Sequence, residues 1–452
     1  MNEYDFEELS RQALQLLEEK KYAKLRNILE IMNEADIALM AEEVEEEVLP
    51  LLFRILPKET AAEVFVEMNS EMQHLLIRAF SDRELKQVID QMYLDDTVDL
   101  IEEMPANVVK RILRHTEPEM RKKINEILRY PKDSAGSIMT IEYVDLKKDM
   151  TVSQAFEHIR KTGVDKETIY TCYVTEADRK LIGLVSVKTL LLSDFDLKLS
   201  DIMETNIISV HTLEDQETVV QQFDKYDFLA IPVVDGENRL VGIVTVDDAM
   251  DILREENSED IALMAAITPS DKPYLKTSPF QLWKARVPWL LLLMISATFT
   301  QMIITSFENK LAVCVALTAY IPMLMGTAGN SGNQASATVI QGLSVGELKF
   351  SDSLRIIGKE ALVALLCGIT LAVCNFGKMM LVDQKGFMVA LVVSLTLPFI
   401  VICAKVVGAG LPVLAKKLGF DPAVVASPFI STIMDSVSLL TYFLIASHFL
   451  EL

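Results

Sequence analysis

The spacing of apolar residues changes twice along the chain and divides it into three parts. In the first part, residues 1–135, apolar side chains recur every three or four positions, as in Leu9, Ala13, Leu16 and Leu17. This spacing is typical of short amphipathic helices, and repeated prolines separate one helix from the next. We expect an all-α N-terminal domain built as a superhelical stack of helix pairs, which either binds a ligand or acts as a spacer.

Beyond residue 135 the apolar period becomes two, which indicates strands, and a pattern occurs twice. The segment LIGLVS at Leu181–Ser186 matches LVGIVT at Leu240–Thr245, and an Ile-Met pair ending at Met139 or Met203 precedes each copy. Each copy is predicted to be a small sheet followed by helices. The repeat resembles a tandem pair of CBS domains over residues 136–256. In that family the pair packs into a disc, dimerises and regulates an attached channel or enzyme.

Many CBS domains bind adenine nucleotides through a short Gly, Thr or Ser, and Asp motif. The second copy supplies Gly242, Thr245 and Asp248, whereas the first has Thr189 where the acid belongs. The resemblance therefore implies one site for a nucleotide such as ATP. A turn from strand to helix favours Gly and Asp without any ligand, so a purely structural role for these three residues stays open.

The third part, residues 282–452, is dominated by long apolar runs. The 21 residues from Val287 to Phe307 carry no charge and as a helix would reach roughly 31 Å, about one hydrocarbon thickness. Further runs are Leu311–Gly346, Ala361–Gly377, Gly386–Ala404 and Pro422–Leu450. We predict an α-helical membrane domain of five spans, in contact with a lipid bilayer.

Charge differs sharply between the membrane part and the rest of the chain. Residues 282–452 hold 8 acidic and 11 basic side chains, which leaves 57 of the 65 acidic and 32 of the 43 basic ones for the remainder. Such an acidic surface would repel the phosphates of nucleic acids, so it argues against a nucleic acid partner and favours cations. The flanking Lys and Arg residues favour a cytoplasmic N-terminus, and an odd number of spans then places the C-terminus outside a plasma (inner) membrane.

An acidic segment connects the soluble and membrane parts, within residues 247–281. Its part Asp247–Asp260 is predicted to be helical, with carboxylates three and four positions apart along one face, and Arg254 is the only base in that part. Carboxylates crowded in this way repel one another and would gain from a bridging divalent cation, for which oxygen ligands without His or Cys indicate a hard ion. The alternative is an ordinary solvated helix face. A similar group, in the sequence YLDDTVDLIEE, lies in the N-terminal domain.

Two features of the membrane part indicate permeation. Pro322 and three glycines occur in PMLMGTAGNSGNQ, and we expect irregular backbone there, lining a cavity and offering carbonyl and Asn oxygens to a hydrated cation. A glycine-rich packing seam is the alternative. Asp435 lies near the middle of the last apolar run, where a carboxylate costs about 2.5–3.5 kcal/mol and should face water or protein. Lys405 is its obvious partner if Asp435 is merely structural.

The order of these parts, with GTAGNSGNQ in the second span and DPAVVASPFISTIMD in the fifth, resembles the MgtE family of magnesium transporters over nearly the whole chain. The resemblance implies a homodimeric, Mg²⁺-selective channel, not an enzyme, closed by cytosolic Mg²⁺. It implies pore positions at Asp435, Asn333, Gly326 and Gly329. It also implies regulatory Mg²⁺ positions at Asp95, Asp99, Asp227, Asp248, Asp251, Glu256, Glu259 and Asp421.

One alternative remains open from the residues themselves. A single carboxylate in a span could carry a proton, so the protein could instead be an ion-coupled secondary transporter of divalent cations such as Co²⁺, Ni²⁺ or Mn²⁺, regulated by an adenine nucleotide. An enzyme is disfavoured because the sequence holds no phosphate-binding loop of the G-x-x-x-x-G-K type, and its 5 His residues are scattered.

Overall fold

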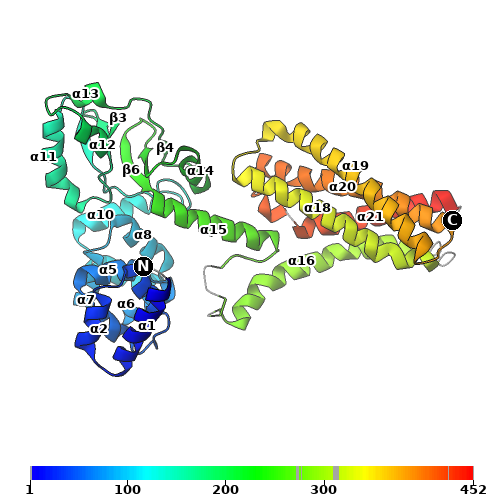
Figure 1. Cartoon of the computed structure of the whole chain (residues 1–452), viewed down its shortest axis with the longest axis horizontal. Coiled ribbons are helices and arrows are strands. Elements are labelled where there is room, and N and C mark those ends of the chain that lie inside the picture. The colour runs from blue at the N-terminus through cyan, green and yellow to red at the C-terminus, as the bar shows by residue number, and fades with distance from the viewer. Residues whose placement is uncertain (1–2, 271–273, 276, 309–314, 426, 451–452) are drawn as a thin grey trace. The chain divides into compact units, whose positions relative to one another are not determined.

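The computed structural model describes residues 3–270, 274–275, 277–308, 315–425 and 427–450. The chain divides into two compact units, Met1–Met250 and Asp251–Leu452. Helix α15 (Val246–Met264) contains the boundary between them. Figure 1 shows the elements of each unit in chain order.

The first unit begins with a stack of short helices around one apolar core, as the apolar spacing predicts. The core is continuous from Ala13 to Ile127 and draws side chains from nearly every helix. The helices are α1 (Glu3–Glu18), α2 (Tyr22–Leu29), α3 (Glu34–Ala41), α4 (Leu49–Ile55), α5 (Lys58–Val66), α6 (Ser70–Ala79), α7 (Asp82–Ile89), α8 (Leu94–Glu103), α9 (Ala106–His115) and α10 (Pro118–Ile127).

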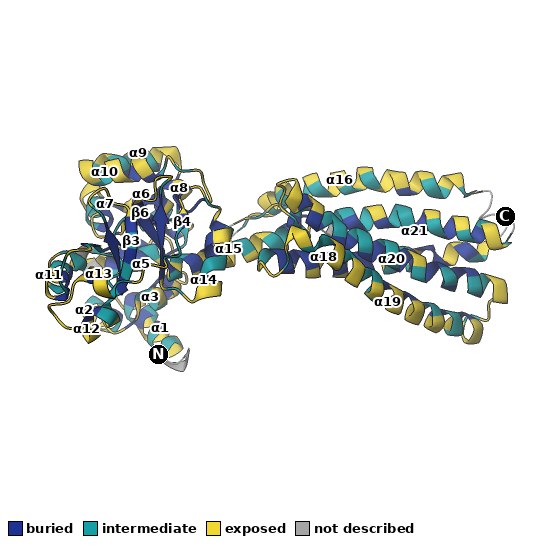
Figure 2. Ribbon diagram, turned by 90° about the horizontal axis from the view of Figure 1, so that it is seen from above, coloured by how far each residue is buried: buried dark blue, intermediate teal, exposed yellow. Residues whose placement is uncertain are grey.

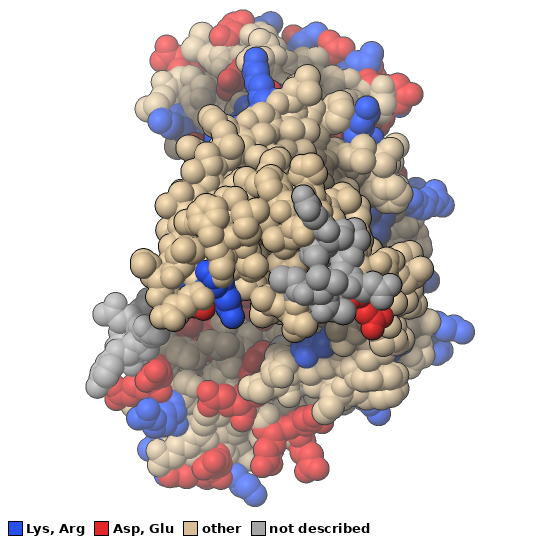
Figure 3. Space-filling model, turned by 90° about the vertical axis from the view of Figure 1, so that its right-hand side faces the viewer, with Lys and Arg blue, Asp and Glu red and all other residues tan. Residues whose placement is uncertain are grey.

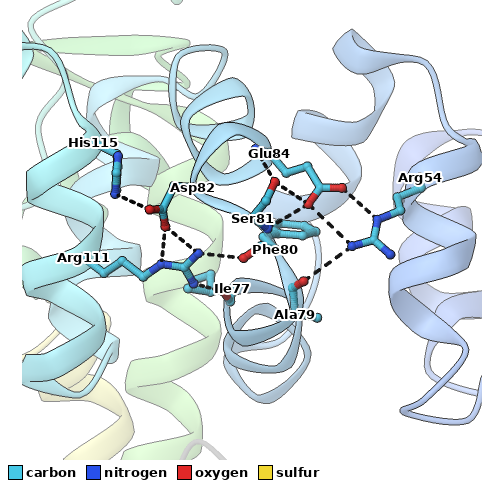
Figure 4. A network of polar contacts seen from close by, with 9 residues as sticks. All are labelled: Arg54, Ile77, Ala79, Phe80, Ser81, Asp82, Glu84, Arg111 and His115. Atoms are coloured by element: carbon cyan, nitrogen blue, oxygen red, sulfur yellow. Dashed lines mark hydrogen bonds and ion pairs between the residues drawn. The ribbon is translucent and has the colours of Figure 1, made fainter.

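A polar network ties neighbouring helices of this stack together (Figure 4). Arg111 of α9 donates to the carbonyl oxygens of Ile77 and Phe80, at the end of α6, and to the Asp82 carboxylate. Glu84 closes a capping box with Ser81 and accepts from Arg54 of α4. The Arg54 hydrogen bond lowers the pKa of Glu84 to about 2, so this carboxylate stays ionised at any physiological pH.

Two similar three-stranded sheets follow, which confirms that the pattern seen twice in the sequence is a structural repeat. The first holds β1 (Asp145–Lys147), β2 (Thr171–Thr175) and β3 (Leu181–Ser186), and the second β4 (Val210–His211), β5 (Ala230–Val234) and β6 (Leu240–Thr245). In both sheets the first pair of strands is parallel and the second antiparallel. The accompanying helices are α11 (Val152–Thr162), η1 (Gly163–Asp165), α12 (Val187–Leu192), α13 (Leu199–Ile202) and α14 (Gln216–Tyr226).

The segment that precedes each copy packs on the other copy. Met139, ahead of the first copy, packs on Gly242 of the second, and Met203, ahead of the second copy, packs on Gly183 of the first. A Cβ atom at either glycine would lie 2.6 Å from the methionine sulfur, which leaves no room for a side chain. The repeated Ile-Met and Gly positions of the sequence therefore form matching contacts between the copies.

The second unit is a bundle of long helices. Its elements after α15 are α16 (Pro279–Ser306), η2 (Val315–Tyr320), α18 (Ile321–Ser344), η3 (Phe350–Asp352), α19 (Ser353–Leu381), α20 (Phe387–Lys417), η4 (Ala423–Val425) and α21 (Ser427–Leu450). Among the described residues, four helical segments are long and apolar enough to cross a membrane: Pro279–Ser306, Phe350–Leu381, Phe387–Lys417 and Pro428–Leu450. The polar helix α18 is not one of them, and the predicted fifth span stays a prediction.

Helix α20 is the centre of this bundle and packs against α18, α19 and α21. Figure 2 shows the resulting dark stripe of buried residues along α20, whereas α16 is largely exposed. The outer surface of the unit is apolar, and its end in Figure 3 shows few charged side chains. Apolar side chains that cover the outside of a bundle are expected where lipid replaces water as the solvent.

The expectation of irregular backbone in the glycine-rich segment is wrong. Helix α18 is continuous from Ile321 to Ser344, with Pro322 in its first turn, where a proline costs no hydrogen bond. The glycines instead permit close packing, because Gly332 lies against Ile430 of α21 and against the backbone of α20 at Ala404 and Gly408. Of the two alternatives left open by the sequence, the structure supports the packing seam.

This close approach predicts a large effect of one methyl group. In Gly408→Ala, the new Cβ would overlap the carbonyl oxygen of Gly332, so α20 must move away from α18. We expect the variant to lose about 1–3 kcal/mol of stability, measured by denaturant unfolding in detergent micelles. Gly410→Ala is the matched control, since no atom lies within 4 Å of its Cβ position. Equal stability of the two variants would contradict the packing.

Candidate cation sites

Asp435 lies in the middle of α21, half-buried and without a basic partner among the described residues. The partner considered from sequence, Lys405, pairs instead with Glu360 of α19, with 3.3 Å between nitrogen and oxygen. Asp435 is therefore not the only acid inside the apolar helices, since Glu360 lies within α19, immediately before the uncharged run that begins at Ala361. The carboxylate of Asp435 is left uncompensated by any described cation.

Helix α18 places polar groups beside α21 close to Asp435. The Asn333 Nδ2 donates to Oγ of Ser431, one helical turn before Asp435, at 3.2 Å. Gly329 also lies next to Ser431, since a Cβ atom added at Gly329 would be 3.5 Å from the Oγ atom of Ser431. Gly326 lies on an exposed part of α18. We call residues 329–333, Gly-Asn-Ser-Gly-Asn, the polar turn of α18.

One atom of the polar turn has an unused hydrogen-bonding capacity. The Asn333 Oδ1 is buried and accepts no hydrogen bond within the described structure. A buried acceptor without a donor is costly, by about 1–3 kcal/mol, and such a cost is repaid when water or a hydrated ion supplies the missing donor. The side chains near Asp435 therefore fit a cation that retains its water shell.

A second acidic site lies inside the first unit, and we call it the acid cluster. It combines carboxylates of α8, of the first repeat copy and of the first turn of α15. Its members are Asp95, Asp96, Asp99, Glu142, Glu167, Asp247 and Asp248, and charges within this group raise the pKa values of Asp95, Asp96, Asp99, Glu167 and Asp248. The N-terminal domain and the end of the second copy thus present like charges to each other within one compact unit.

Burial and repulsion from neighbouring carboxylates both favour the protonated forms of Asp95, Asp96, Glu167 and Asp248. Burial, followed by the neighbouring carboxylates, raises the pKa of Asp95, Asp96 and Asp248 to about 7 and that of Glu167 to about 8. The charges that raise these pKa values all come from other carboxylates. The cluster therefore has an excess of negative potential, which a divalent cation would relieve.

Asp95 is the most buried member of the cluster, with 7% of its surface exposed. Its Oδ1 has no hydrogen-bond partner in the described structure, and the same is true of the Glu167 Oε2. The Asp248 carboxylate is held by a hydrogen bond from the hydroxyl of Thr245. Oxygen atoms that are buried, anionic and unsatisfied are the donors expected for Mg²⁺.

Sequence reasoning missed Glu142 and Glu167. Each is an isolated acid in the first copy, and a backbone hydrogen bond from Glu167 to Glu142, 2.9 Å long, brings their segments together. No spacing signal could have revealed them, because their proximity to Asp95 depends on the packing of α8 on the repeat. Asp96, by contrast, stands next to Asp95 and was visible in the acidic run.

The remaining predicted regulatory residues are not among the named members of the acid cluster. Asp227 is exposed and ends α14 in a left-handed conformation, with φ of 54°. The other residues, Asp251, Glu256, Glu259 and Asp421, belong to the second unit. Asp251 pairs with Arg254 at 2.9 Å, and Asp421 accepts from the backbone amide of Ala423 at 2.7 Å. In the described ranges no three His, Cys, Asp or Glu side chains are close enough to enclose a bare metal ion.

Within the second unit, the end of α15 contacts α18 and η4, the short helix that precedes α21. Leu263 packs with Ile340 of α18 and Ala423 of η4. Asp260 accepts a hydrogen bond of 3.5 Å from the hydroxyl of Ser344, at the end of α18. The acidic helix therefore contacts α18, which holds Asn333, and the segment that leads into α21, which holds Asp435.

The candidate nucleotide residues take structural positions in the second copy. Gly242 lies in β6 under Met139, and Thr245 begins the turn into α15, where it binds Asp248. In the first copy the hydroxyls of Ser186 and Thr189 make the equivalent contact, 2.9 Å apart. These contacts explain the presence of the motif residues without a ligand. Asp248 is also a member of the acid cluster.

These features define a class: a membrane transport protein with a carboxylate in its apolar unit and a soluble unit made of a helical domain and a CBS pair. Family models match along the chain: "MgtE intracellular N domain" at 32–133, "CBS domain" at 135–194 and 199–255, and "Divalent cation transporter" at 321–445. The chain belongs to the MgtE family of magnesium transporters, which are not enzymes.

Individual relatives resemble the chain over almost its whole length. A magnesium transporter MgtE of Thermus thermophilus is 36% identical over 98% of this chain and 99% of its own. That of Bacillus subtilis is 32% identical over 99% and 98%. The crystal structure of the cytosolic domain of the Mg²⁺ channel MgtE in complex with ATP is 33% identical, with a TM-score of 0.52, and covers 54% of this chain and 99% of that chain. The soluble part of a magnesium transporter gives a TM-score of 0.52 at 29% identity, over 56% and 99%.

The raised pKa values of the acid cluster predict a pH-dependent stability of the first unit. An acid whose pKa rises on folding contributes stability below its unfolded pKa, near 4, and loses it as the pH passes the folded value. Without divalent cations, the thermal midpoint for proteolysis of residues 1–250 in the full chain should fall between pH 5.5 and pH 8.5, through pKa values of about 7 and 8.

The substitution Asp95→Asn removes one of the repelling charges and keeps the shape of the side chain. We expect the variant to have a higher midpoint than wild type at pH 8.5 and a smaller advantage at pH 5.5, because the loss of stability begins at the unfolded pKa near 4 and is complete only above about 7. Asp224→Asn, at an exposed position of α14, serves as the control and should follow wild type. A midpoint that rises with pH in the wild type would contradict the assignment of repulsion to the cluster.

Proposed function

We propose that the protein is a homodimeric Mg²⁺ channel of the plasma membrane, with its soluble domains in the cytoplasm and its C-terminus outside. The observation that carries the proposal is the uncompensated charge of Asp435 within an apolar helix, because the available lysine is neutralised by Glu360. An isolated carboxylate in a span is retained where it serves an ion path.

In this proposal, Asp435 attracts Mg²⁺ without removing its water. Mg²⁺ dehydrates reluctantly, so binding through its water shell leaves the ion free to move on. The free Oδ1 of Asn333 accepts hydrogen bonds from that shell. The exposed Gly326 leaves the surface of α18 open to it, and Gly329 lets Ser431 approach the helix closely. The membrane potential supplies about 2.3 kcal/mol per charge per 100 mV, and hence about twice that for a divalent ion.

The acid cluster acts as the cytosolic sensor. At low Mg²⁺, repulsion between Asp95 and Asp248 opposes the contact of the N-terminal domain with the CBS pair. At high Mg²⁺, hydrated ions cancel this repulsion and favour the closed arrangement. The same reasoning applies to Asp99 and Asp227 in the first unit and to Asp251, Glu256, Glu259 and Asp421 around α15 and η4.

Helix α15 carries the signal to the pore. Its first turn holds Asp248 of the sensor, and its last turns contact α18 and η4 through Leu263 and Asp260. A movement of the first turn of α15 therefore changes the contacts that its last turns make with α18 and with η4, the segment before α21. The state with few bound ions releases these helices and opens the pore.

Adenine nucleotide binding at the second CBS copy is a further part of the proposal. The solved cytosolic domain of a relative contains ATP. In this chain Gly242, Thr245 and Asp248 would contact it, and Asp248 would then belong to both the nucleotide site and the Mg²⁺ sensor. Binding of one ligand would change the affinity for the other through this shared carboxylate.

Asp435→Asn tests the pore directly. The variant keeps the shape of the side chain but loses the charge that attracts a divalent ion, so we expect at least a tenfold loss of Mg²⁺ current, since a single charge in a low-dielectric site is worth more than about 1.4 kcal/mol. The measurement is single-channel recording of purified protein in bilayers. Asp352→Asn, at the end of η3, is the control.

The same recordings separate a channel from a carrier. Unitary Mg²⁺ currents in wild type support the channel, whereas Mg²⁺ transport without unitary currents, dependent on a proton gradient, would favour the ion-coupled carrier. Wild-type currents in Asp435→Asn would contradict the role of this aspartate.

Neutralising the sensor should leave conduction intact and remove closure. For Asp248→Asn, Asp251→Asn, Glu256→Gln and Glu259→Gln combined, we expect wild-type unitary current but a higher Mg²⁺ concentration for closure from the cytoplasmic side. Open probability against cytoplasmic Mg²⁺ is the measurement, with Asp224→Asn as the control. A variant that closes at the wild-type concentration would refute the sensor.

A further inference from the structure

The most deeply buried ion pair of the described residues has no role in the mechanism so far. Lys405 of α20 and Glu360 of α19 have side chains that are 7% and 16% exposed, and 3.3 Å separates their charged atoms. Both lie in helical segments that are long and apolar enough to cross a membrane. Burying an ion pair costs more in lost hydration than well-packed apolar residues of the same size would, so stability alone does not account for it.

The backbone around Lys405 faces the polar turn of α18. The carbonyl oxygen of Ala404, the preceding residue, lies 3.3 Å from the Cβ position of Gly332. Gly408, one turn after Lys405, lies against the carbonyl group of the same Gly332. Helix α20 therefore contacts the polar turn through the backbone on one side while Lys405 fixes it to α19.

Gly332 is directly connected to the groups that face the proposed ion path. It precedes Asn333, whose amide donates to Ser431, and Ser431 lies one turn before Asp435. A rotation or shift of α20 by a fraction of an ångström must displace Gly332, because backbone atoms on both helices are already in contact. Such a displacement would change the distance between Asn333 and Asp435.

We propose that Glu360 and Lys405 are positioning residues that set cation selectivity by holding α20 in register against the polar turn. This inference rests on the proposed conduction of Mg²⁺. A charge-assisted hydrogen bond has one preferred length and direction, whereas apolar contacts tolerate sliding. The pair thereby specifies one arrangement of the turn, and hence one spacing of the groups that recognise the hydrated ion. Neither residue touches the ion.

The test is the double variant Glu360→Gln, Lys405→Met, which removes both charges at similar volume. We expect it to fold and to conduct, with the permeability ratio of Mg²⁺ over Na⁺ lowered about tenfold, as is usual when groups that orient metal-binding residues are lost. The measurement is the reversal potential in bilayers with unequal Mg²⁺ and Na⁺. The reversed pair Glu360→Lys, Lys405→Glu restores the tie and should recover most of the ratio.

Controls separate the possible outcomes. Arg355→Met removes an exposed base of α19 and should leave the ratio unchanged. A double variant that folds and keeps the wild-type ratio would overturn the inference. If the double variant does not fold, Lys405→Arg decides, because it keeps the charge and alters the reach: a changed ratio supports the inference and an unchanged ratio overturns it. A wild-type protein that shows no Mg²⁺ current would refute the proposed function instead.

Discussion

The structure depends on the cost of placing a negative charge where water is scarce. In the apolar unit, Asp435 has no described cation beside it, although a lysine is available in the bundle. In the soluble unit, Asp95 is buried among other acids, and its pKa is raised to about 7. Both places are unfavourable without a cation, and in the proposed function the same physical interaction would serve transport in one unit and sensing in the other.

The two sites differ in how the surrounding structure responds to a cation. Asn333 lies on α18, which packs on α20 through backbone contacts at Gly332 and Gly408. Gly332 also lies against the side chain of Ile430 of α21, the helix that holds Asp435, and these contacts leave little freedom to move. The acid cluster joins separate elements, α8, the first repeat copy and α15, whose only shared feature is like charge. A rigid site suits passage of an ion, and a site between elements that repel one another suits a switch.

The sequence predicts most of the architecture, because each part has its own periodicity. The stacked helices, the repeated sheets and the long apolar helices follow from spacings of three and four, of two, and from uncharged runs. The predicted break in α18 failed because glycine was interpreted as a disruptor of helices. In the structure Gly332 and Gly408 instead remove side chains between two helices, a role that depends on a partner 76 residues away in the sequence.

The sites were predicted less completely, and the reason is the same. Asp435, Asp95 and Asp248 stand in recognisable motifs, but Glu142 and Glu167 are isolated acids whose position depends on tertiary packing. Glu360 was passed over because it borders an uncharged run, and its pairing with Lys405 was not foreseen. That pairing matters most, because it engages the lysine that would otherwise be the obvious structural partner of Asp435.

The most direct test of the central claim is a high-resolution density map of the full-length protein in lipid nanodiscs with Mg²⁺. We predict a peak beside Asp435, at about 4 Å from its carboxylate oxygens, rather than the 2.0–2.1 Å of direct Mg²⁺ coordination, with ordered water between them. A map in which Asp435 contacts Lys405, or is enclosed by apolar side chains with no water path, would contradict the account.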